Sequence, residues 1–227
     1  MKIIELEEVD STNEYCKCWD FKGDIAVVAK KQLSGRGTKG RSFVSDEGGL
    51  YISVMKHYDN FPAGNAFKIM VNACVAVCRT LESLGLEPEI RWANDVLVDG
   101  KKICGTLIEN TFSGAEITRS IVGIGINVNN AIPTELECVA TSITQHILTK
   151  VRVDKVKNLL LSNLENAYNI SDYKKYIRWF GKEVNLRTDD GERQVTALDI
   201  SDDGRLVVRE TDGTVNKISS AEVSLRL

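Results

Sequence analysis

The stretch RWANDVLVDGKKICGTLIEN, residues 91–110, decides how the middle of this chain is expected to fold. Apolar residues run on both sides of the pair Asp99-Gly100, and an Asp-Gly pair between two apolar segments is a strong hairpin signal. We therefore predict one strand over 89–98, a tight turn, and a second strand over 102–110.

The hairpin carries polar side chains that could do chemistry. In an extended strand alternate side chains share a face, so Arg91 and Asp95 are expected on one side. Across the turn, Lys102 is expected to return close to Asn94 and Asp95. The spacing also allows a surface hairpin with ordinary ion pairs and with Trp92 in the core.

The flanking segments extend this sheet and add helices. Apolar residues recur at intervals of three and four over 65–84, and Gly85 stands where a helix would stop. Further strands are expected over 3–9, 25–29, 50–56 and 115–129, and further helices from about Ser11, over 155–168 and over 172–179.

After Gly181 the pattern changes to short apolar runs separated by the pairs Asp190-Gly191, Asp203-Gly204 and Asp212-Gly213. Turn signals at this regular spacing are typical of a small all-β barrel. We therefore predict an α+β fold in two domains, with a main domain over 1–180 and a small β domain over 181–227.

The composition excludes several classes of protein. The chain has 227 residues, 43% of them hydrophobic and 27% charged, with a formal net charge of −3. These values are ordinary for a globular protein and exclude nucleic-acid binding through overall charge. The acidic N-terminal segment does not resemble a signal peptide, and no apolar run is long enough to span a membrane, so a cytoplasmic protein without a membrane partner is expected.

The six cysteines form no CxxC pair, and the chain has only two histidines. All six are expected in apolar surroundings. Cys74 and Cys78 lie four residues apart in the predicted helix, so reduced thiols packed in the core are favoured over a zinc site or disulfides.

The loop KKQLSGRGTKGRSF, residues 30–43, is the most basic part of the chain. Its glycines allow backbone N–H groups to approach a ligand, and Arg36 and Arg41 can bind phosphate or carboxylate through paired hydrogen bonds. A phosphate site fits best, although the loop lacks the GxxxxGK[ST] spacing. A solvated, mobile basic loop is the alternative.

A third motif, IVGIGINVNN over 121–130, places two glycines inside an apolar strand. Glycines there allow a ligand or another backbone to come near, and Asn127 follows them. A bulge or a tight packing point explains the pattern equally well.

Together, DSTN at 10–13, QLSGRGTKGRSF at 32–43, RWANDV with KKICGTLIE at 91–109, and GIGINVN at 123–129 resemble the biotin protein ligases in order and spacing. The resemblance spans nearly the whole chain. It implies a mixed central sheet with flanking helices, like that of class II synthetases and lipoate ligases, followed by a small SH3-like β-barrel. DSTN begins at residue 10, so the DNA-binding part of some family members is expected to be missing, and no DNA partner is expected.

The resemblance also implies an activity. Members make biotinyl-5'-AMP from biotin and Mg-ATP, and then transfer biotin to one lysine of a biotin carboxyl carrier domain. The implied small molecules are therefore biotin, ATP and Mg²⁺, and the implied protein partner is the carrier domain of a biotin-dependent carboxylase. Family members occur as monomers and as homodimers, and the sequence does not decide between them.

Carried over by motif, the resemblance assigns roles to single residues. The implied biotin-binding residues are Ser11, Thr12, Asn13, Gln32, Gly35, Arg36, Lys102 and Gly105. The implied ATP- and adenylate-binding residues are Arg36, Thr38, Arg41, Phe43, Asn94, Asp95, Lys102 and Asn127, with Mg²⁺ near Asn94 and Asp95. Lys102, Arg36 and Arg41 are the implied catalytic residues.

The chain departs from the family pattern at four positions. Thr38 replaces a common arginine and Phe43 the usual tryptophan, while Arg91 and Ala93 replace lysine and proline. Because Lys102, Asn94 and Asp95 remain, an active enzyme is predicted. The alternatives are a ligase of the related lipoate or octanoate type, or a biotin-binding protein without enzymatic activity.

Overall fold

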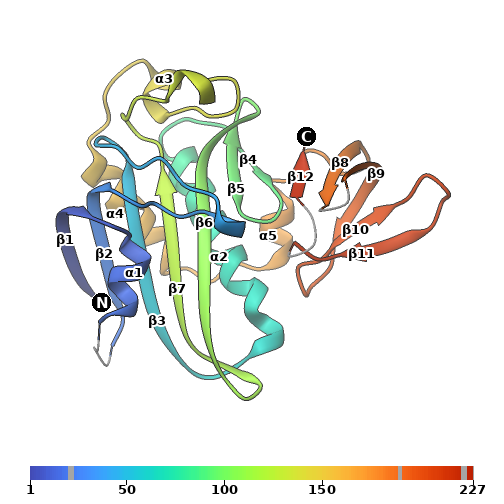
Figure 1. Ribbon diagram of the computed structural model, residues 1–227, viewed down its shortest axis with the longest axis horizontal. Helices are drawn as coiled ribbons and strands as arrows, with labels where there is room; N and C mark the ends of the chain where they lie inside the picture. Colours follow the sequence, from blue (N-terminus) through green and yellow to red (C-terminus); the bar gives the residue numbers. More distant parts are fainter. Residues whose placement is uncertain (20–22, 189–190, 221–223, 227) are drawn as a thin grey trace.

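A mixed seven-stranded sheet forms the larger part of the molecule (Figure 1). The computed structural model describes residues 1–19, 23–188, 191–220 and 224–226. The strand order is β1-β2-β3-β7-β6-β5-β4. The strands are β1 (Lys2–Val9), β2 (Ile25–Gln32), β3 (Leu50–Pro62), β4 (Pro88–Arg91), β5 (Asp95–Val98), β6 (Lys101–Ser113) and β7 (Glu116–Ile126). β1 runs parallel to β2, and the remaining neighbours pair antiparallel.

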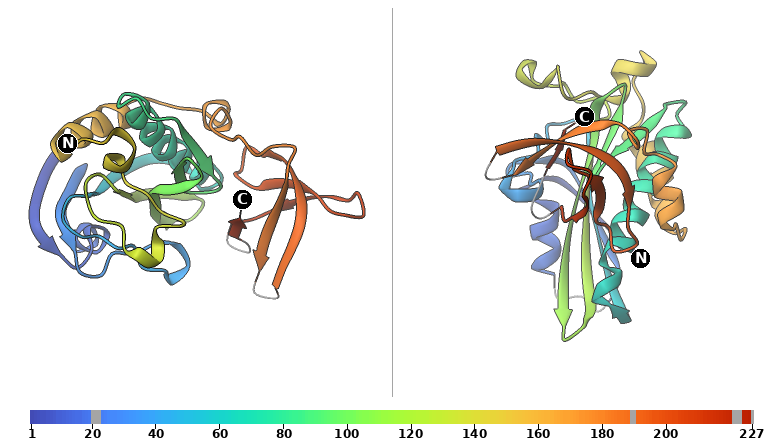
Figure 2. Two further views of the ribbon diagram at one scale, coloured as in Figure 1. Left: turned by 90° about the horizontal axis from the view of Figure 1, so that it is seen from above. Right: turned by 90° about the vertical axis from the view of Figure 1, so that its right-hand side faces the viewer.

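Helices cover both faces of this sheet. On one face, α1 (Thr12–Lys17) buries Cys16 against Ile25, Val27 and Met55. The other face carries the main core, where α2 (Ala66–Glu82) buries a stripe of apolar residues. Figures 1 and 2 show α4 (Val153–Leu164) beside α2 on this face. The α+β fold expected from the sequence is confirmed.

Most predicted elements are present with shifted ends. The helix predicted over 65–84 is α2, and Gly85 follows it with a φ of 82°. The predictions over 155–168 and 172–179 correspond to α4 and to the shorter α5 (Ile170–Lys174). A further helix, α3 (Ile143–Ile147), was not predicted.

The single strand predicted over 89–98 is wrong, because the chain turns at Trp92–Asn94 and forms β4 and β5. These strands pair antiparallel, and Arg91 lies opposite Asp95. The Trp92–Ala93 peptide bond is cis. Two buried aromatic side chains brace the turn: Tyr173 Oη donates to Ala93 O at 2.8 Å, and Trp179 Nε1 donates to Ile90 O at 2.9 Å.

A second, five-stranded antiparallel sheet forms the C-terminal part, in the order β11-β10-β9-β8-β12 (Figure 2). Its strands are β8 (Glu183–Thr188), β9 (Gly191–Ile200), β10 (Leu206–Arg209), β11 (Val215–Ile218) and β12 (Ser224–Arg226). The predicted turns at Asp203-Gly204 and Asp212-Gly213 separate β9, β10 and β11. Asp190, in the third predicted turn, lies outside the described residues.

Contacts from the turn after β4 and from α5 join the main domain to the C-terminal sheet. Trp92 Nε1 donates to Gly204 O at 2.9 Å, and Lys174 Nζ lies 2.7 Å from Asp199 Oδ1. A Cβ on Gly204 would lie 2.2 Å from Cγ of Phe67, so a glycine is needed where the C-terminal sheet approaches α2. The turn that follows β4 therefore lies beside the C-terminal sheet.

All six cysteines are free thiols. Cys16, Cys74, Cys78 and Cys104 are buried, but Cys18 and Cys138 are exposed, so the expectation of apolar surroundings for all six is wrong. Burial raises the pKa of the Cys16 thiol to about 12. In the described part of the chain, no helix combines the length and the apolar character needed to span a membrane.

Candidate active site

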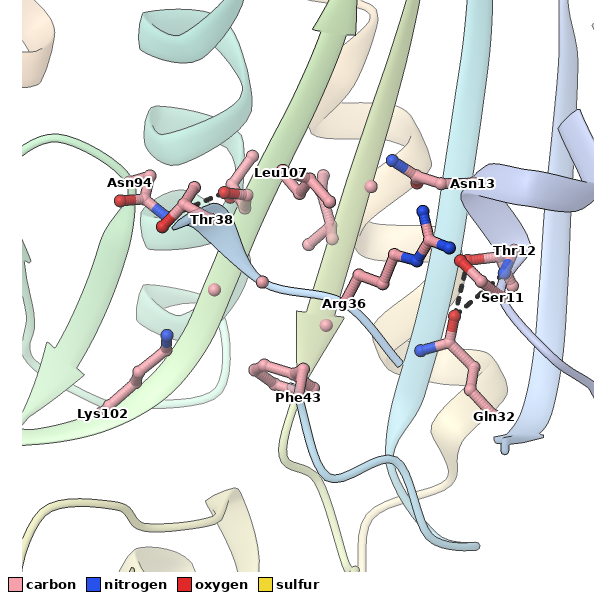
Figure 3. A pocket seen from close by; sticks show the side chains of 16 residues that line it. Ser11, Thr12, Asn13, Gln32, Arg36, Thr38, Phe43, Asn94, Lys102 and Leu107 are labelled. Carbon is pink, nitrogen blue, oxygen red and sulfur yellow. Dashed lines mark hydrogen bonds between the residues drawn. The ribbon is translucent and has the colours of Figure 1, made fainter. Parts of the chain in front are cut away.

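The N-terminus of α1 brings polar side chains to one end of a small cavity (Figure 3). Ser11 caps the helix, and its hydroxyl accepts from the backbone N–H of Glu14 at 3.5 Å. Gln32, at the end of β2, accepts from both the backbone N–H and the hydroxyl of Thr12, at 2.9 and 3.1 Å. Ser11 and Thr12 are both buried, so these hydrogen bonds hold the helix N-terminus against the sheet.

Asn13 is fixed by two partners that the sequence did not single out. Its Nδ2 donates to Glu109 Oε2 at 2.8 Å, and its Oδ1 lies 2.5 Å from the hydroxyl of Ser53. A Cβ on Gly123 would lie 2.2 Å from the same Oδ1. One glycine of the GIGIN motif is therefore required for close packing of a cavity side chain.

Phe43 lies across two strands whose facing positions carry no side chain. Gly105 on β6 is the register partner of Gly125 on β7. A Cβ on Gly125 would lie 2.7 Å from the Phe43 ring, and one on Gly105 would lie 2.9 Å from Lys102 Nζ. The ring centroid of Phe43 lies 5.6 Å from Lys102 Nζ, within the range of a cation–π contact. Phe43 thus forms one wall of the cavity beside Lys102.

Lys102 and Arg91 share the carboxylate of Asp95. Lys102 Nζ lies 2.7 Å from Oδ1, and Arg91 Nη2 lies 2.8 Å from Oδ2. Burial would raise the pKa of Asp95, but the charges and hydrogen bonds of Lys102 and Arg91 outweigh it, and the pKa is lowered. Asp95 is therefore ionised at neutral pH and fixes both cations.

The β5–β6 register explains how Lys102 reaches Asp95. Asp95 lies opposite Gly105, and regular alternation from there would turn Lys101 toward the carboxylate. A register shift between Val96 and Leu97 puts Lys102 opposite Leu97 instead. Backbone hydrogen bonds from Lys102 N to Val139 O and from Thr141 N to Lys102 O, at 2.8 and 2.9 Å, hold this position.

Asn94 and Thr38 lie on the far side of the cavity, where a second cavity of about 410 Å³ opens toward the C-terminal sheet. Asn94 Nδ2 donates to Thr106 O at 2.8 Å, so Oδ1 of the same amide points away from Thr106 O. Arg41 lines the second cavity, and its Nε donates to Thr38 O at 3.3 Å.

The basic loop is smaller than the sequence indicated, because Lys30 and Lys31 belong to strand β2. Lys30 pairs with Glu7 at 2.8 Å and Lys31 with Glu8 at 3.4 Å, both on β1. Arg36 lines the cavity and pairs with Glu14 of α1 at 2.7 Å. The loop's own cationic side chains are thus Arg36, Lys39 and Arg41.

Asn127 does not line the same cavity as the α1 residues. It lines a neighbouring cavity of about 250 Å³, together with Phe43, Lys102 and apolar residues of 132–140. Its Nδ2 donates to Thr141 O at 3.0 Å, and its Oδ1 accepts from Asn130 at 3.1 Å. Asn127 thus ties the end of β7 to the segment that pairs with Lys102.

The structure brings together most of the residues singled out by sequence around one cavity: Ser11, Thr12, Asn13, Gln32, Arg36, Thr38, Phe43, Asn94, Lys102 and Gly105. Asp95 and Arg41 line the second cavity, and Gly35 packs behind the loop, where a Cβ would lie 2.3 Å from Phe43 O. The first cavity measures only about 40 Å³, room for a few water molecules. Ligand sites are usually several hundred Å³.

At Asn94 and Asp95, where Mg²⁺ is expected, the carboxylate is shared by two cationic side chains. No group of three metal-binding side chains occurs within residues 1–19, 23–188, 191–220 and 224–226. Both oxygens of Asp95 already contact cations, so this carboxylate is a poor ligand for a divalent ion. Asn94 Oδ1 alone does not provide a site.

Comparison with known proteins matches both parts of the chain. The biotin/lipoate A/B protein ligase family matches residues 6–127, and the biotin protein ligase C-terminal domain matches residues 180–226. The bifunctional ligase/repressor BirA of Bacillus subtilis is 34% identical over 217 residues, which cover 88% of this chain and 65% of that protein. The chain thus spans slightly less than two thirds of this curated relative.

Two solved structures are similar over nearly their whole length. The biotin protein ligase of Aquifex aeolicus in complex with biotin and ATP is 30% identical, with a TM-score of 0.81 over 99% of this chain and 98% of that one. The biotin protein ligase of Leishmania major in complex with biotinyl-5-AMP is 25% identical, with a TM-score of 0.64 over 96% of this chain and 99% of that one. The family match over 6–127, more than half of the chain, shows that the chain belongs to the biotin/lipoate A/B protein ligase family.

Proposed function

We propose that this protein is an ATP-dependent biotin protein ligase. It activates biotin as biotinyl-5'-AMP and transfers the biotinyl group to a lysine of a biotin carboxyl carrier domain. The observation that carries the proposal is the position of Lys102, which lines both the polar cavity at α1 and the apolar cavity at 132–140. A cation between two such cavities suits a reaction that joins two anions.

The polar end of the first cavity supports biotin as the acid that is activated. The ureido ring of biotin has two N–H donors and one carbonyl acceptor, and hydroxyl and amide groups of Ser11, Thr12, Asn13 and Gln32 gather there. The dithiolane ring of lipoate and the tail of octanoate have no such groups. A lipoyl or octanoyl group would therefore gain no hydrogen bonds at this end of the cavity, whereas the ureido ring of biotin would.

The apolar cavity at 132–140 supports a site for the adenine ring, with Asn127 and Phe43 at its edge. With biotin at α1 and adenine there, the biotin carboxylate and the α-phosphate meet at Lys102. Arg36, Arg41 and Thr38 of the loop then lie near the phosphates, as does Asn94.

The first step is a displacement at phosphorus. A carboxylate oxygen of biotin attacks the α-phosphorus, the bond from that phosphorus to the bridging oxygen breaks, and pyrophosphate leaves. Lys102 offsets the repulsion between the two anions, and Asp95 holds its ammonium group in position. In the second step an acceptor lysine amine attacks the acyl carbon, loses a proton, and AMP leaves.

Magnesium enters this proposal only with ATP. Since both oxygens of Asp95 contact cations, we place no protein-held metal at Asn94 and Asp95, and Mg²⁺ would arrive bound to the phosphates as part of the substrate. We also propose that the chain consists of two domains, over 1–180 and 181–227. We propose a cytoplasmic location.

One experiment tests the proposal. The protein is incubated with biotin, ATP, magnesium and a purified carrier domain, and the mass of the carrier is measured. A gain equal to one biotinyl group is expected with biotin and not with lipoate or octanoate. Biotin binding without a mass gain at any enzyme concentration would favour a biotin-binding protein, and pyrophosphate exchange that responds to lipoate alone would favour the lipoate type.

A further inference from the structure

We infer that an ion pair with Glu14 holds Arg36 at the candidate pocket, and that a phosphate-bearing ligand must break this ion pair in order to bind Arg36. The inference rests on the proposed function for the identity of that ligand, but not for the contact itself. Arg36 Nη1 lies 2.7 Å from Glu14 Oε1. Figure 3 shows the Arg36 side chain extending through the pocket toward Asn13 and Thr12.

The contact restrains the whole loop, because the loop is folded on itself. Arg36 and Ser42 form an isolated antiparallel bridge, Gly37 N donates to Arg41 O at 2.6 Å, and Phe43 N donates to Gly35 O at 2.8 Å. Anchoring Arg36 therefore also keeps the Phe43 ring packed against Gly105 and Gly125. These two side chains help to reduce the cavity to about 40 Å³.

Glu14 has a second cation that allows Arg36 to leave. Lys17 Nζ lies 2.8 Å from the same Glu14 Oε1 and 2.6 Å from Glu109 Oε1. The hydrogen bond from Lys17 lowers the pKa of Glu14, and the charge of Arg36 adds to this effect. When Arg36 moves to a phosphate, Glu14 keeps Lys17 as a partner, so no carboxylate is left unpaired.

The strength of the contact suits a reversible restraint. The side chains of Arg36 and Glu14 are 57% and 35% exposed, and exposed ion pairs stabilise weakly. A phosphate offers more negative charge and can accept two parallel hydrogen bonds from the guanidinium, so it competes well for Arg36. Glu14 is thus a positioning residue that acts through Arg36.

The test is a double-mutant cycle with Glu14→Gln, Arg36→Gln and both together, using ATP as the titrated ligand in a calorimeter. Losing an exposed ion pair corresponds to about a 1.5- to 5-fold change, so Glu14→Gln should tighten ATP binding by that factor. In the Arg36→Gln background the same substitution should change nothing. Glu7→Gln removes another exposed pair, with Lys30, and serves as the matched control.

An unchanged or weaker affinity of Glu14→Gln, or the same gain in both backgrounds, would overturn the inference. A second readout needs no ligand: trypsin cleavage after Arg41, which is exposed, followed by mass spectrometry. Glu14→Gln should be cut faster than wild type, and Glu7→Gln should not. If the protein does not biotinylate a carrier but Glu14→Gln is still cut faster than wild type, the proposed function fails and the restraint stands. Equal cutting rates would overturn the restraint, whether or not the protein biotinylates a carrier.

Discussion

Replacing Asp95 by asparagine removes the carboxylate that Lys102 and Arg91 share. The substitution keeps the shape of the side chain and one carbonyl acceptor, so either Lys102 or Arg91 can keep a hydrogen bond, now to a neutral oxygen. The other cation then faces an amide NH₂ group, which cannot accept a hydrogen bond. The side chains of Asp95, Lys102 and Arg91 are 15%, 29% and 26% exposed, so water replaces the lost partner only in part.

The expected loss follows from these contacts. A hydrogen bond to a charged group contributes about 1.5 to 3 kcal/mol, and Asp95 makes two of them, one of which the asparagine retains in weaker form. We expect the free energy of unfolding to fall by about 2 to 3 kcal/mol. For a chain of this size that lowers Tm by about 4 to 12 °C. Misplacement of Lys102 should also lower kcat for biotin-dependent pyrophosphate exchange by about 100-fold.

Urea unfolding at pH 7 measures the first quantity, and Asp99→Asn on the same hairpin is the matched control. Asp99 has a φ of 50°, which asparagine tolerates, and its side chain is 79% exposed. It lies 3.2 Å from His146 Nδ1, and the loss of such an exposed pair should cost at most about 1 kcal/mol. Equal stability of Asp95→Asn and Asp99→Asn would refute the reasoning.

Comparing wild type with Asp95→Asn across pH tests the sign of the pKa shift of Asp95. The pKa of Asp95 is lowered in the folded state, so its contribution is complete above the unfolded pKa of about 4 and is lost as pH falls through the folded pKa. The difference in stability between wild type and Asp95→Asn should therefore be constant from pH 5 to 8 and shrink below pH 4. A difference that grew in acid would contradict the assignment.

Three further predictions concern the pocket itself. Lys102→Ala should lower kcat for pyrophosphate exchange by about 100- to 1,000-fold while biotin still binds, which single-turnover kinetics and calorimetry would separate. Gly125→Ala places a Cβ 2.7 Å from the Phe43 ring and should change the KM for ATP more than that for biotin, with Gly64→Ala, which meets nothing within 4 Å, as control. Thr38→Arg should slow release of the adenylate in a filter-binding chase, and an unchanged rate would show that Thr38 does not contact it.

The sequence predicts the elements around the site well because their signals are local. The cap at Ser11, the periodicity of α2 and the turn at Asp99-Gly100 each depend on neighbours within a few residues. The broken strand at 92–94 could not be read in this way. Its turn has no glycine or proline, and the groups that brace it, Tyr173 and Trp179, come from eighty or more residues later in the chain.

The partners of the predicted site residues show the same limit. Family motifs single out Asn13, but Ser53 and Glu109, which orient its amide, belong to β3 and β6 and carry no motif. A serine among the apolar residues of β3 was the one local signal that could have indicated a cavity there. The cations available in the loop likewise depend on the pairing of β1 with β2, because Lys30 and Lys31 form ion pairs with Glu7 and Glu8 of β1.

The glycines of the third motif connect these observations. Sequence alone allowed a bulge or a packing point at Gly123 and Gly125, and both positions serve close approach: Gly123 to Asn13 and Gly125 to Phe43. With Gly105 opposite Gly125, they leave part of one face of β6 and β7 without side chains. A face cleared in this way can hold either a loop side chain or a flat ligand, since both need the same absence of Cβ atoms. In this structure Phe43 takes that position and Arg36 is tied to Glu14, so the contacts that shape the pocket are also the ones that a ligand has to replace.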